Sequence, residues 1–198
     1  MTATILLIRH AAHSHLGNVL SGRAGDVPLS HEGRDQARCL AGRLVDGNLH
    51  EIHSSPVRRA RETAREISDA VDIPVTTADA LDEIDFGSWS GKRFAELEGD
   101  PLWREWNERR DTAATPAGET MQAVQERATR HLRDTALAAP GRNLAMVTHC
   151  DVIRAVVAGI VGLPLRNILS FEVGPASISR IAIGSWGERL LTLNEGGA

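Results

Sequence analysis

Short apolar runs recur along the chain and predict buried β-strands. Such runs occupy residues 5–8 and 143–148, and two further strand candidates are residues 49–54, with Ile52 at the centre, and residues 75–77. A continuous apolar run that ends in polar or turn-forming residues is typical of a strand that is covered on both faces. We therefore expect these four segments to lie within a central sheet.

Between these runs, apolar residues recur at the three- and four-residue spacing of helices. One helix is predicted over residues 30–45 with Ser30 as its N-cap, and a second begins with Pro56 in its first turn. Two more are predicted over residues 119–137 and 152–161, the last one capped by Asp151. Strands that alternate with helices in this way predict a doubly wound layer of parallel strands.

Residues 81–118 interrupt this alternation. The segment holds most of the aromatic residues of the chain, with glycines between them, and two short helices are predicted over residues 92–97 and 102–109. We interpret it as an insertion that folds over a site, within one domain that spans residues 1–198. Near the end of the chain, residues 176–183 and 189–193 flank a Gly-Ser-Trp-Gly turn and predict a hairpin at the sheet edge.

The composition narrows the choice of partners. Of the 198 residues, 42% are hydrophobic and 24% are charged, which is ordinary for a globular domain. The formal charge of −4 gives no overall basic character, so neither nucleic acid nor a membrane surface is expected as a partner. The two cysteines form no disulfide framework, and no apolar run or leader pattern indicates export. A cytoplasmic protein is expected.

Two histidines follow predicted strands at equivalent places. Arg9 and His10 end the first apolar run, and His149 ends the run over residues 143–148. The carboxyl ends of parallel strands meet at one edge of a sheet, and ligands gather there. We therefore expect both imidazoles to lie close together at this edge.

Three arginines lie at the start of the helix after the second strand, at the same edge: Arg58, Arg59 and Arg61. A guanidinium group matches the oxygens of a phosphate, and a helix N-terminus adds a partial positive charge. Imidazoles among guanidinium groups predict a pocket for a tetrahedral dianion. Arg58 and Arg61 share one side of the helix, and for these two we expect a solvated or ion-pairing role.

Six stretches of the chain form an ordered set that spans nearly its whole length. They are Leu7-Ile8-Arg9-His10-Ala11, Asp26-Val27-Pro28-Leu29-Ser30 with Gly33, Ser54-Ser55-Pro56 with Arg61-Glu62-Thr63-Ala64, Leu81-Asp82-Glu83-Ile84-Asp85-Phe86-Gly87 with Trp89 and Gly91, Pro116-Ala117-Gly118-Glu119-Thr120, and Met146-Val147-Thr148-His149 with Val152-Ile153-Arg154. This set resembles the histidine phosphatase superfamily, in its phosphoglycerate-mutase-like group. The resemblance implies an α/β fold: a three-layer sandwich with a mostly parallel central sheet flanked by helices, and a small helical lid over residues 81–118.

The resemblance also implies a role for each matching residue. His10 would be the nucleophile that becomes phosphohistidine, and Glu83 would be the general acid and then the general base. Arg9, Arg59 and His149 would bind the phosphate and stabilise the charge on its oxygens. This chemistry agrees with the residue types, because neutral imidazole is a competent nucleophile near pH 7 and phosphoryl transfer depends mostly on positioning and charge. Neither a metal nor another cofactor is expected.

The chain departs from the family pattern in the loop after the first strand and after the second histidine. Ala11 replaces a glycine, which is tolerable unless the backbone needs a positive φ there. The family's segment after the signature is missing, and Cys150-Asp151 replaces a pair of glycines. These changes concern substrate recognition more than phosphate chemistry. Three residues of the loop are still predicted to contact the substrate: Asn18, Ser21 and Gly22.

Other activities stay open at the level of sequence. A mutase of the same family is one, but the chain is short and its insertion compact, which favours hydrolysis of a small phosphate monoester. A cluster of His10, His13 and His15, completed by Asp26 or Asp151, is a candidate divalent-metal site. A non-catalytic module that binds a phosphorylated ligand is a third alternative, and a homodimer is also left open. Three arginines of the insertion indicate an anionic substrate: Arg104, Arg109 and Arg110.

Overall fold

The central sheet of the computed structural model, which describes residues 1–23 and 26–196, contains six strands in the order β3-β2-β4-β1-β5-β6. The strands are β1 (Ala3–Arg9), β2 (Leu49–Ser54), β3 (Val75–Thr77), β4 (Asn143–Thr148), β5 (Ile178–Gly184) and β6 (Gly187–Glu195). The first four pair in parallel, and β5 and β6 add an antiparallel hairpin to the β1 edge. The sheet is therefore mixed and mostly parallel, as the pattern of the sequence predicts.

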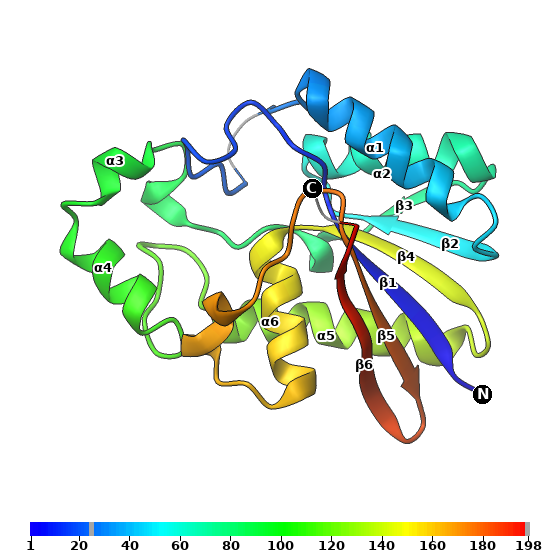
Figure 1. The fold of residues 1–198 in the computed structure, drawn as a ribbon. Helices are drawn as coiled ribbons and strands as arrows, with labels where there is room; N and C mark the ends of the chain where they lie inside the picture. Colours follow the sequence, from blue (N-terminus) through cyan, green and yellow to red (C-terminus); the bar gives the residue numbers. More distant parts are fainter. Residues whose placement is uncertain (24–25, 197–198) are drawn as a thin grey trace.

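Helices cover both faces of this sheet and give three layers (Figure 1). On one face lie α1 (His31–Leu44) and α2 (Arg58–Val71), and on the other lie α5 (Met121–Ala138) and α6 (Cys150–Val161). The side chains of β1 alternate between the two cores: Leu6 and Ile8 pack with the first pair of helices, whereas Ile5 and Leu7 pack with the second pair. This alternation explains why the strand is apolar at every position from Ile5 to Ile8.

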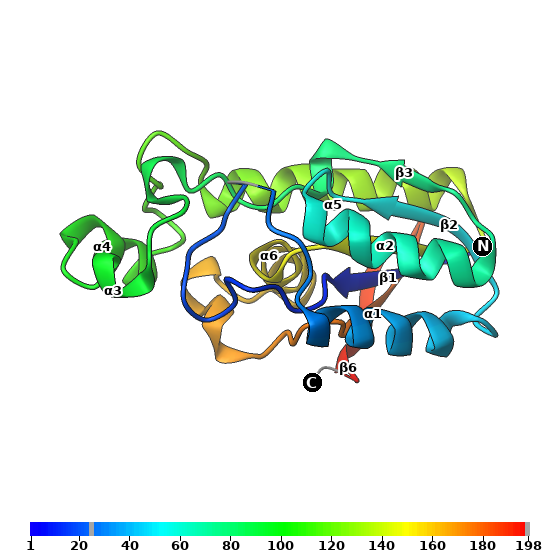
Figure 2. The same ribbon diagram turned by 90° about the horizontal axis from the view of Figure 1, so that it is seen from above.

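The insertion lies beyond the end of the sheet toward which β1 points (Figure 2). It contains α3 (Phe94–Leu97) and α4 (Pro101–Glu108), and short 3-10 turns η1 (Asp79–Leu81) and η2 (Gly87–Trp89) precede them. A further turn, η3 (Leu165–Ser170), follows α6. Trp89 and Trp106 are almost fully buried and join the core beneath α5 and α6. The aromatic residues of the insertion thus anchor it to the sandwich.

Two predicted helix starts are wrong. The N-cap of α2 is Val57, whose N–H donates to Ser55 Oγ at 3.2 Å, so Pro56 precedes the helix and does not lie in its first turn. The N-cap of α6 is His149, because β4 ends at Thr148 and leaves one extended residue before the helix. Asp151 consequently lies inside the first turn of α6 and does not cap it.

The start of α1 matches the prediction and explains an unusual glycine. Ser30 accepts a hydrogen bond from the N–H of Gly33 at 3.0 Å, which makes it the N-cap. A Cβ at Gly33 would lie 1.8 Å from the carbonyl oxygen of Ala12. Gly33 therefore stands where a capping box would place a glutamate, since the helix presses against the chain that leaves β1.

Among the helices of residues 1–23 and 26–196, none combines the length and the apolar character needed to cross a bilayer.

Candidate active site

Residues from separate segments meet beyond the carboxyl ends of β1, β2 and β4. Arg9 pairs with Thr148 in the register of β1 and β4, so the residues that follow these strands, His10 and His149, emerge side by side. Their ring centroids lie 5.1 Å apart. Arg59 reaches the same point from the first turn of α2, and Glu83 from the chain that follows η1. We call Arg9, His10, Arg59, Glu83 and His149 the phosphate end, after the role that the sequence predicts for them.

The hydrogen bonds of His10 fix its tautomer. Its Nδ1 lies 2.8 Å from the carbonyl oxygen of Ala11, which can only accept, so Nδ1 carries the proton. Its Nε2 accepts a hydrogen bond from Arg59 Nε at 3.1 Å, which requires a lone pair on Nε2. Burial and the charges of Arg59 and Arg9 hold the pKa of His10 well below its ordinary value. At neutral pH the ring is therefore uncharged, and its lone pair lies on Nε2 and points toward Arg59.

The guanidinium group of Arg59 organises the phosphate end. It is 1% exposed, and its NH2 donates to the carbonyl of Gly22 at 2.9 Å and to His149 Nδ1 at 3.1 Å. Its NH1 is buried without a hydrogen-bond partner among the described residues, and the same is true of Nε of Arg9. Buried charged donors are rarely left unpaired, so these atoms mark a position for an anion.

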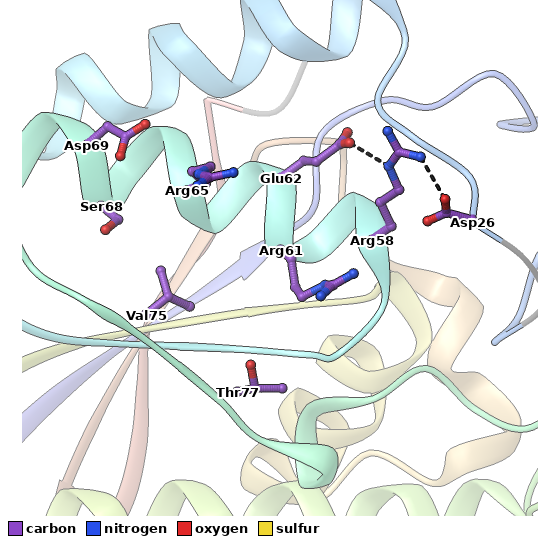
Figure 3. Close-up of a pocket in the computed structure, with 9 residues that line it drawn as sticks. All are labelled: Asp26, Arg58, Arg61, Glu62, Arg65, Ser68, Asp69, Val75 and Thr77. Carbon is purple, nitrogen blue, oxygen red and sulfur yellow. Dashed lines mark hydrogen bonds and ion pairs between the residues drawn. The ribbon is translucent and has the colours of Figure 1, made fainter.

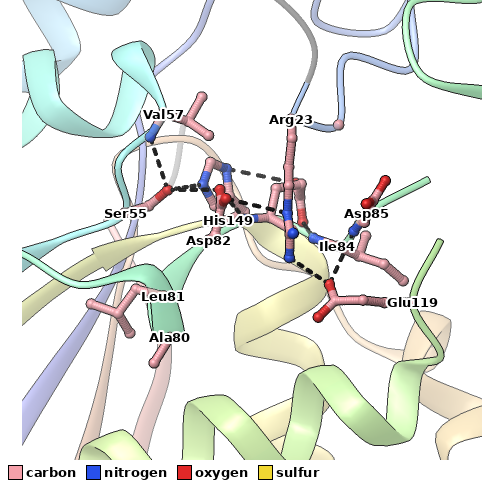
Figure 4. Close-up of polar contacts among 12 residues, drawn as sticks. Arg23, Ser55, Val57, Ala80, Leu81, Asp82, Ile84, Asp85, Glu119 and His149 are labelled. Atoms are coloured by element: carbon pink, nitrogen blue, oxygen red, sulfur yellow. Dashed lines mark hydrogen bonds and ion pairs between the residues drawn. The ribbon is translucent and has the colours of Figure 1, made fainter. Parts of the chain in front are cut away.

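His149 is held by a relay of polar groups (Figure 4). Its Nε2 lies 2.8 Å from Ser55 Oγ, which donates onward to Asp82 Oδ1 at 3.3 Å. Because Nδ1 of His149 accepts from Arg59, Nε2 carries the proton and donates it to Ser55. Burial and the positive charge of Arg59 lower the pKa of His149 well below its ordinary value. The ring is thus neutral and oriented toward the phosphate end.

Glu83 is the acidic group of the phosphate end. Its Oε2 lies 3.6 Å from His149 Nδ1 and 3.8 Å from Arg59 NH2, and the residue is 9% exposed. Burial raises the pKa of Glu83 to about 7, and the charge of Asp151 adds to this rise against the opposing effect of Arg59. A carboxyl group with such a pKa can give and take a proton near neutrality.

Partly buried ion pairs fix the backbone that carries Glu83 (Figure 4). Arg23 donates to the carbonyl of Glu83 at 2.7 Å and to Glu119 at 2.6 Å, and Glu119 also accepts from the N–H of Asp85 at 3.1 Å. Arg127 donates to the same carbonyl of Glu83 at 3.2 Å and to both oxygens of Glu119. The acid is therefore positioned by α5 and by the loop before α1 together.

A cavity of about 290 Å³ opens from the phosphate end. Four residues of the phosphate end line it, whereas His149 lies behind them. The wall also includes the predicted Ser21 and Gly22, and His13, which is 8% exposed. Burial and the charge of Arg59 lower the pKa of His13 to about 4. The side chain of Asn18 is exposed and does not line this cavity. Apolar residues from the loop and the insertion complete the wall: Leu16, Val19, Leu20, Phe86, Phe94 and Trp103.

Comparison with known proteins assigns the chain to a protein family. Residues 5–196 match the family described as histidine phosphatase superfamily (branch 1). The chain belongs to the histidine phosphatase superfamily.

Its relatives in this superfamily are phosphatases. Phosphoserine phosphatase 1 of Hydrogenobacter thermophilus is 31% identical over 194 residues, which cover 96% of this chain and 91% of the relative. The adenosylcobalamin/alpha-ribazole phosphatase of Salmonella typhimurium is 27% identical over 191 residues, which cover 95% and 94%. A mutant phosphoserine phosphatase of Entamoeba histolytica in complex with phosphoserine superposes with a TM-score of 0.87 at 26% identity, over 98% of this chain and 97% of the other. This histidine phosphatase is accordingly a phosphomonoester hydrolase.

A larger hollow of this histidine phosphatase lies along α2 and β3, away from the histidines (Figure 3). It has a volume of about 560 Å³, and Arg58, Arg61 and Arg65 line it together with acidic residues. Arg58 is ion-paired with Glu62 at 2.7 Å and with Asp26 at 2.8 Å. Arg58 and Arg61 thus lie on a charged surface outside the catalytic cavity, as expected from their helical spacing.

The departures from the superfamily pattern now have structural explanations. The φ of Ala11 is not positive, and the residue is fully buried, so the replacement of glycine causes no backbone strain. Within the described residues, no group of three or more His, Cys, Asp or Glu side chains is arranged to hold a metal ion, and this includes His10, His13 and His15. Asp151 lines the cavity and contacts Arg110 of the insertion at 3.2 Å.

Several residues of this site were missed in the sequence. Ser55, Asp82 and Glu119 lie within the motifs that carry the resemblance, which was a signal for them. No sequence pattern indicated Arg23 or Arg127. Arg127 lies on a helix face that reads as an ordinary charged surface, and only the fold brings it under Glu83.

Proposed function

We propose that the protein hydrolyses a small phosphate monoester through a phosphohistidine intermediate on His10, with Glu83 as general acid and then general base. The observation that supports this most is that Arg59, whose Nε donates to His10 Nε2, also has a buried NH1 with no hydrogen-bond partner among the described residues. A nucleophile and a free cationic donor at one point suit a phosphoryl group, which needs attack on phosphorus and charge stabilisation on its oxygens.

In the first step, the lone pair of His10 Nε2 attacks phosphorus and the bond from phosphorus to the ester oxygen breaks. Glu83 in its protonated form gives its proton to that oxygen, so the alcohol leaves neutral. Arg9 and Arg59 donate to the phosphoryl oxygens, and their hydrogen bonds compensate the charge that these oxygens carry. The intermediate is phosphohistidine, and Glu83 is left as a carboxylate.

In the second step, the Glu83 carboxylate takes a proton from a water molecule, whose oxygen attacks phosphorus. The bond between Nε2 and phosphorus breaks, and the lone pair returns to His10. Inorganic phosphate leaves, and Glu83 is again protonated. A pKa of about 7 suits Glu83 to both steps, because both of its forms are populated near neutral pH.

The size of the cavity and the relatives support a small substrate. A cavity of about 290 Å³ admits a metabolite rather than a phosphorylated protein segment. The name of one relative mentions phosphoserine, which is a small phosphate monoester. Hydrolysis agrees with this better than mutase activity, since no relative described above is named a mutase.

The experiment is phosphate release from a panel of sugar phosphates, phosphoglycerates, nucleotides and an aryl phosphate. We expect turnover with chelator present, inhibition by vanadate, and a loss of at least about 1,000-fold in His10→Ala, because the nucleophile acts as a unit with its helpers. His31→Ala is the matched control, since that side chain is 90% exposed at the start of α1 and we expect it to keep full activity. Phosphate transfer to a second substrate molecule without release would identify a mutase, and no reaction at all would identify a binding module.

A further inference from the structure

A second group of charged residues lines the catalytic cavity beyond the phosphate end. Arg110 follows α4 of the insertion, and Asp151 and Arg154 lie on the first turns of α6. Asp151 Oδ2 accepts from Arg110 NH1 at 3.2 Å, and Asp151 Oδ1 lies 3.7 Å from Arg154 NH1. We call Arg110, Asp151 and Arg154 the head-group corner.

Each arginine of this corner has an unpaired hydrogen-bond donor. Their side chains are only 7% and 13% exposed, and Nε of each is buried without a hydrogen-bond partner among the described residues. Arg110 is also rigid, because NH2 donates to Asn107 Oδ1 at 2.9 Å and the guanidinium lies 5.4 Å from the ring centroid of Trp106. Preorganised, unpaired guanidinium donors call for an anionic acceptor from the ligand.

Asp151 changes which anion fits. It adds a carboxylate to the wall of the cavity. A carboxylate has about four acceptor positions, and the two arginines do not occupy all of them. A ligand anion that bound Arg110 and Arg154 would lie near Asp151, which would repel it unless the ligand also carried a positive group there. A ligand head group that carries both an anionic and a cationic group would place each of its charges against a residue of opposite charge.

The corner lies close to the phosphate end. Asp151 and Arg154 follow His149 by two and five residues, which is about 3 Å and about 7.5 Å along the axis of a helix. The charge of Asp151 also raises the pKa of Glu83, so a ligand group that contacts Asp151 lies near the phosphate end. Together with the volume of the cavity, this favours a small molecule with three or four carbons.

We propose that the substrate is the phosphate ester of a hydroxy amino acid, whose ammonium group contacts Asp151 and whose carboxylate contacts Arg110 and Arg154. Asp151 is then the residue that determines specificity for an amino group. This inference rests on the proposed phosphatase function and names the substrate class of the same site.

Four phosphate esters test the contribution of each head-group charge separately. O-phosphoserine carries both charges, 3-phosphoglycerate has a hydroxyl in place of the ammonium, phosphoethanolamine lacks the carboxylate, and glycerol 1-phosphate lacks both. We expect kcat/KM of the wild type to be highest for O-phosphoserine, by at least tenfold over each of the other three. Glycerol 1-phosphate reports the phosphate chemistry alone.

Two variants and a control test the assignment. Asp151→Asn keeps the shape of the side chain, and we expect it to lower the ratio of kcat/KM for O-phosphoserine to that for 3-phosphoglycerate by at least tenfold. This ratio cancels any effect of Asp151 on Glu83, because both substrates need the same acid. Arg110→Gln should lower kcat/KM for both substrates that carry a carboxylate by at least tenfold, relative to kcat/KM for glycerol 1-phosphate. Arg109→Gln is the control, since that side chain is 63% exposed and should leave all ratios unchanged.

Two outcomes would overturn the inference while the phosphatase function stands. One is a wild type that hydrolyses O-phosphoserine no better than 3-phosphoglycerate. The other is an Asp151→Asn variant that slows all four esters by the same factor, which would identify a structural ion pair. Failure of the proposed function would look different, since no ester, including an aryl phosphate, would then release phosphate.

Discussion

The two ends of the catalytic cavity are built on different principles. At the phosphate end, the side chains follow parallel strands or begin a helix, and hydrogen bonds to the backbone fix the tautomer of His10 and the position of Arg59. At the head-group corner, one helix and a segment of the insertion meet through the ion pair of Arg110 and Asp151. The first arrangement suits chemistry shared by all phosphate esters, and the second suits the choice among them.

The largest expected effect separates these two ends. Arg59→Gln removes the cation that contacts His10, His149 and Glu83, and we expect kcat/KM to fall by about 1,000-fold, at the upper end of what one preorganised donor contributes. The loss should be equal for esters with and without a charged head group. Steady-state kinetics of Arg58→Gln, a partly buried neighbour that is ion-paired outside the cavity, should match the wild type. A loss in Arg59→Gln that depended on the head group would remove the division between the two ends.

A smaller effect is expected from the acid. Glu83→Gln should lower kcat/KM for an alkyl phosphate by about 100-fold, and less for an aryl phosphate, whose alcohol leaves without a proton. Because the pKa of Glu83 is raised to about 7 and only the protonated form can act as acid, kcat/KM of the wild type for the alkyl ester should fall as pH rises above 7. The pH profile of the variant should lack this decline. A decline that persisted in Glu83→Gln would assign the proton to another group.

The smallest expected effect concerns the support behind the phosphate end. Gly33→Ala places a Cβ against the carbonyl of Ala12, and overpacking of this kind should lower the free energy of unfolding by about 1–3 kcal/mol. Gly42→Ala on the same helix meets no atom within 4 Å and should raise it by about 0.5–1 kcal/mol. Urea denaturation measures both. Equal effects of the two substitutions would show that the contact with Ala12 is unimportant.

The same division explains what the sequence could predict. The strands, their parallel pairing and the proximity of His10 and His149 follow from hydrophobic patterns and from the geometry of sheets. The structure confirms them. The choice of Arg59 over Arg58 came from the resemblance to the superfamily, because helical spacing alone left it open.

The head-group corner could not be predicted in this way. The sequence connects Asp151 with substrate recognition but places it as a helix cap, an error of two residues in the start of α6, and it gives no sign of the ion pair with Arg110. Arg110 was noted as a charge of the insertion, but its partner lies 41 residues away in the chain. Contacts between such distant segments depend on how the insertion packs, and local sequence patterns do not predict that packing.

The most direct test of the central claim is to trap and map the intermediate. Glu83→Gln should accumulate a phosphoenzyme with an aryl phosphate, since the first step then needs no acid whereas the attack by water lacks its base. After denaturation in alkali, which preserves phosphohistidine, peptide mapping and ³¹P NMR give the residue and the nitrogen. We predict one phosphate on His10, at Nε2, because Nδ1 holds its proton against the carbonyl of Ala11. A phosphate on any other residue, or an enzyme that releases phosphate without ever becoming phosphorylated, would contradict the account.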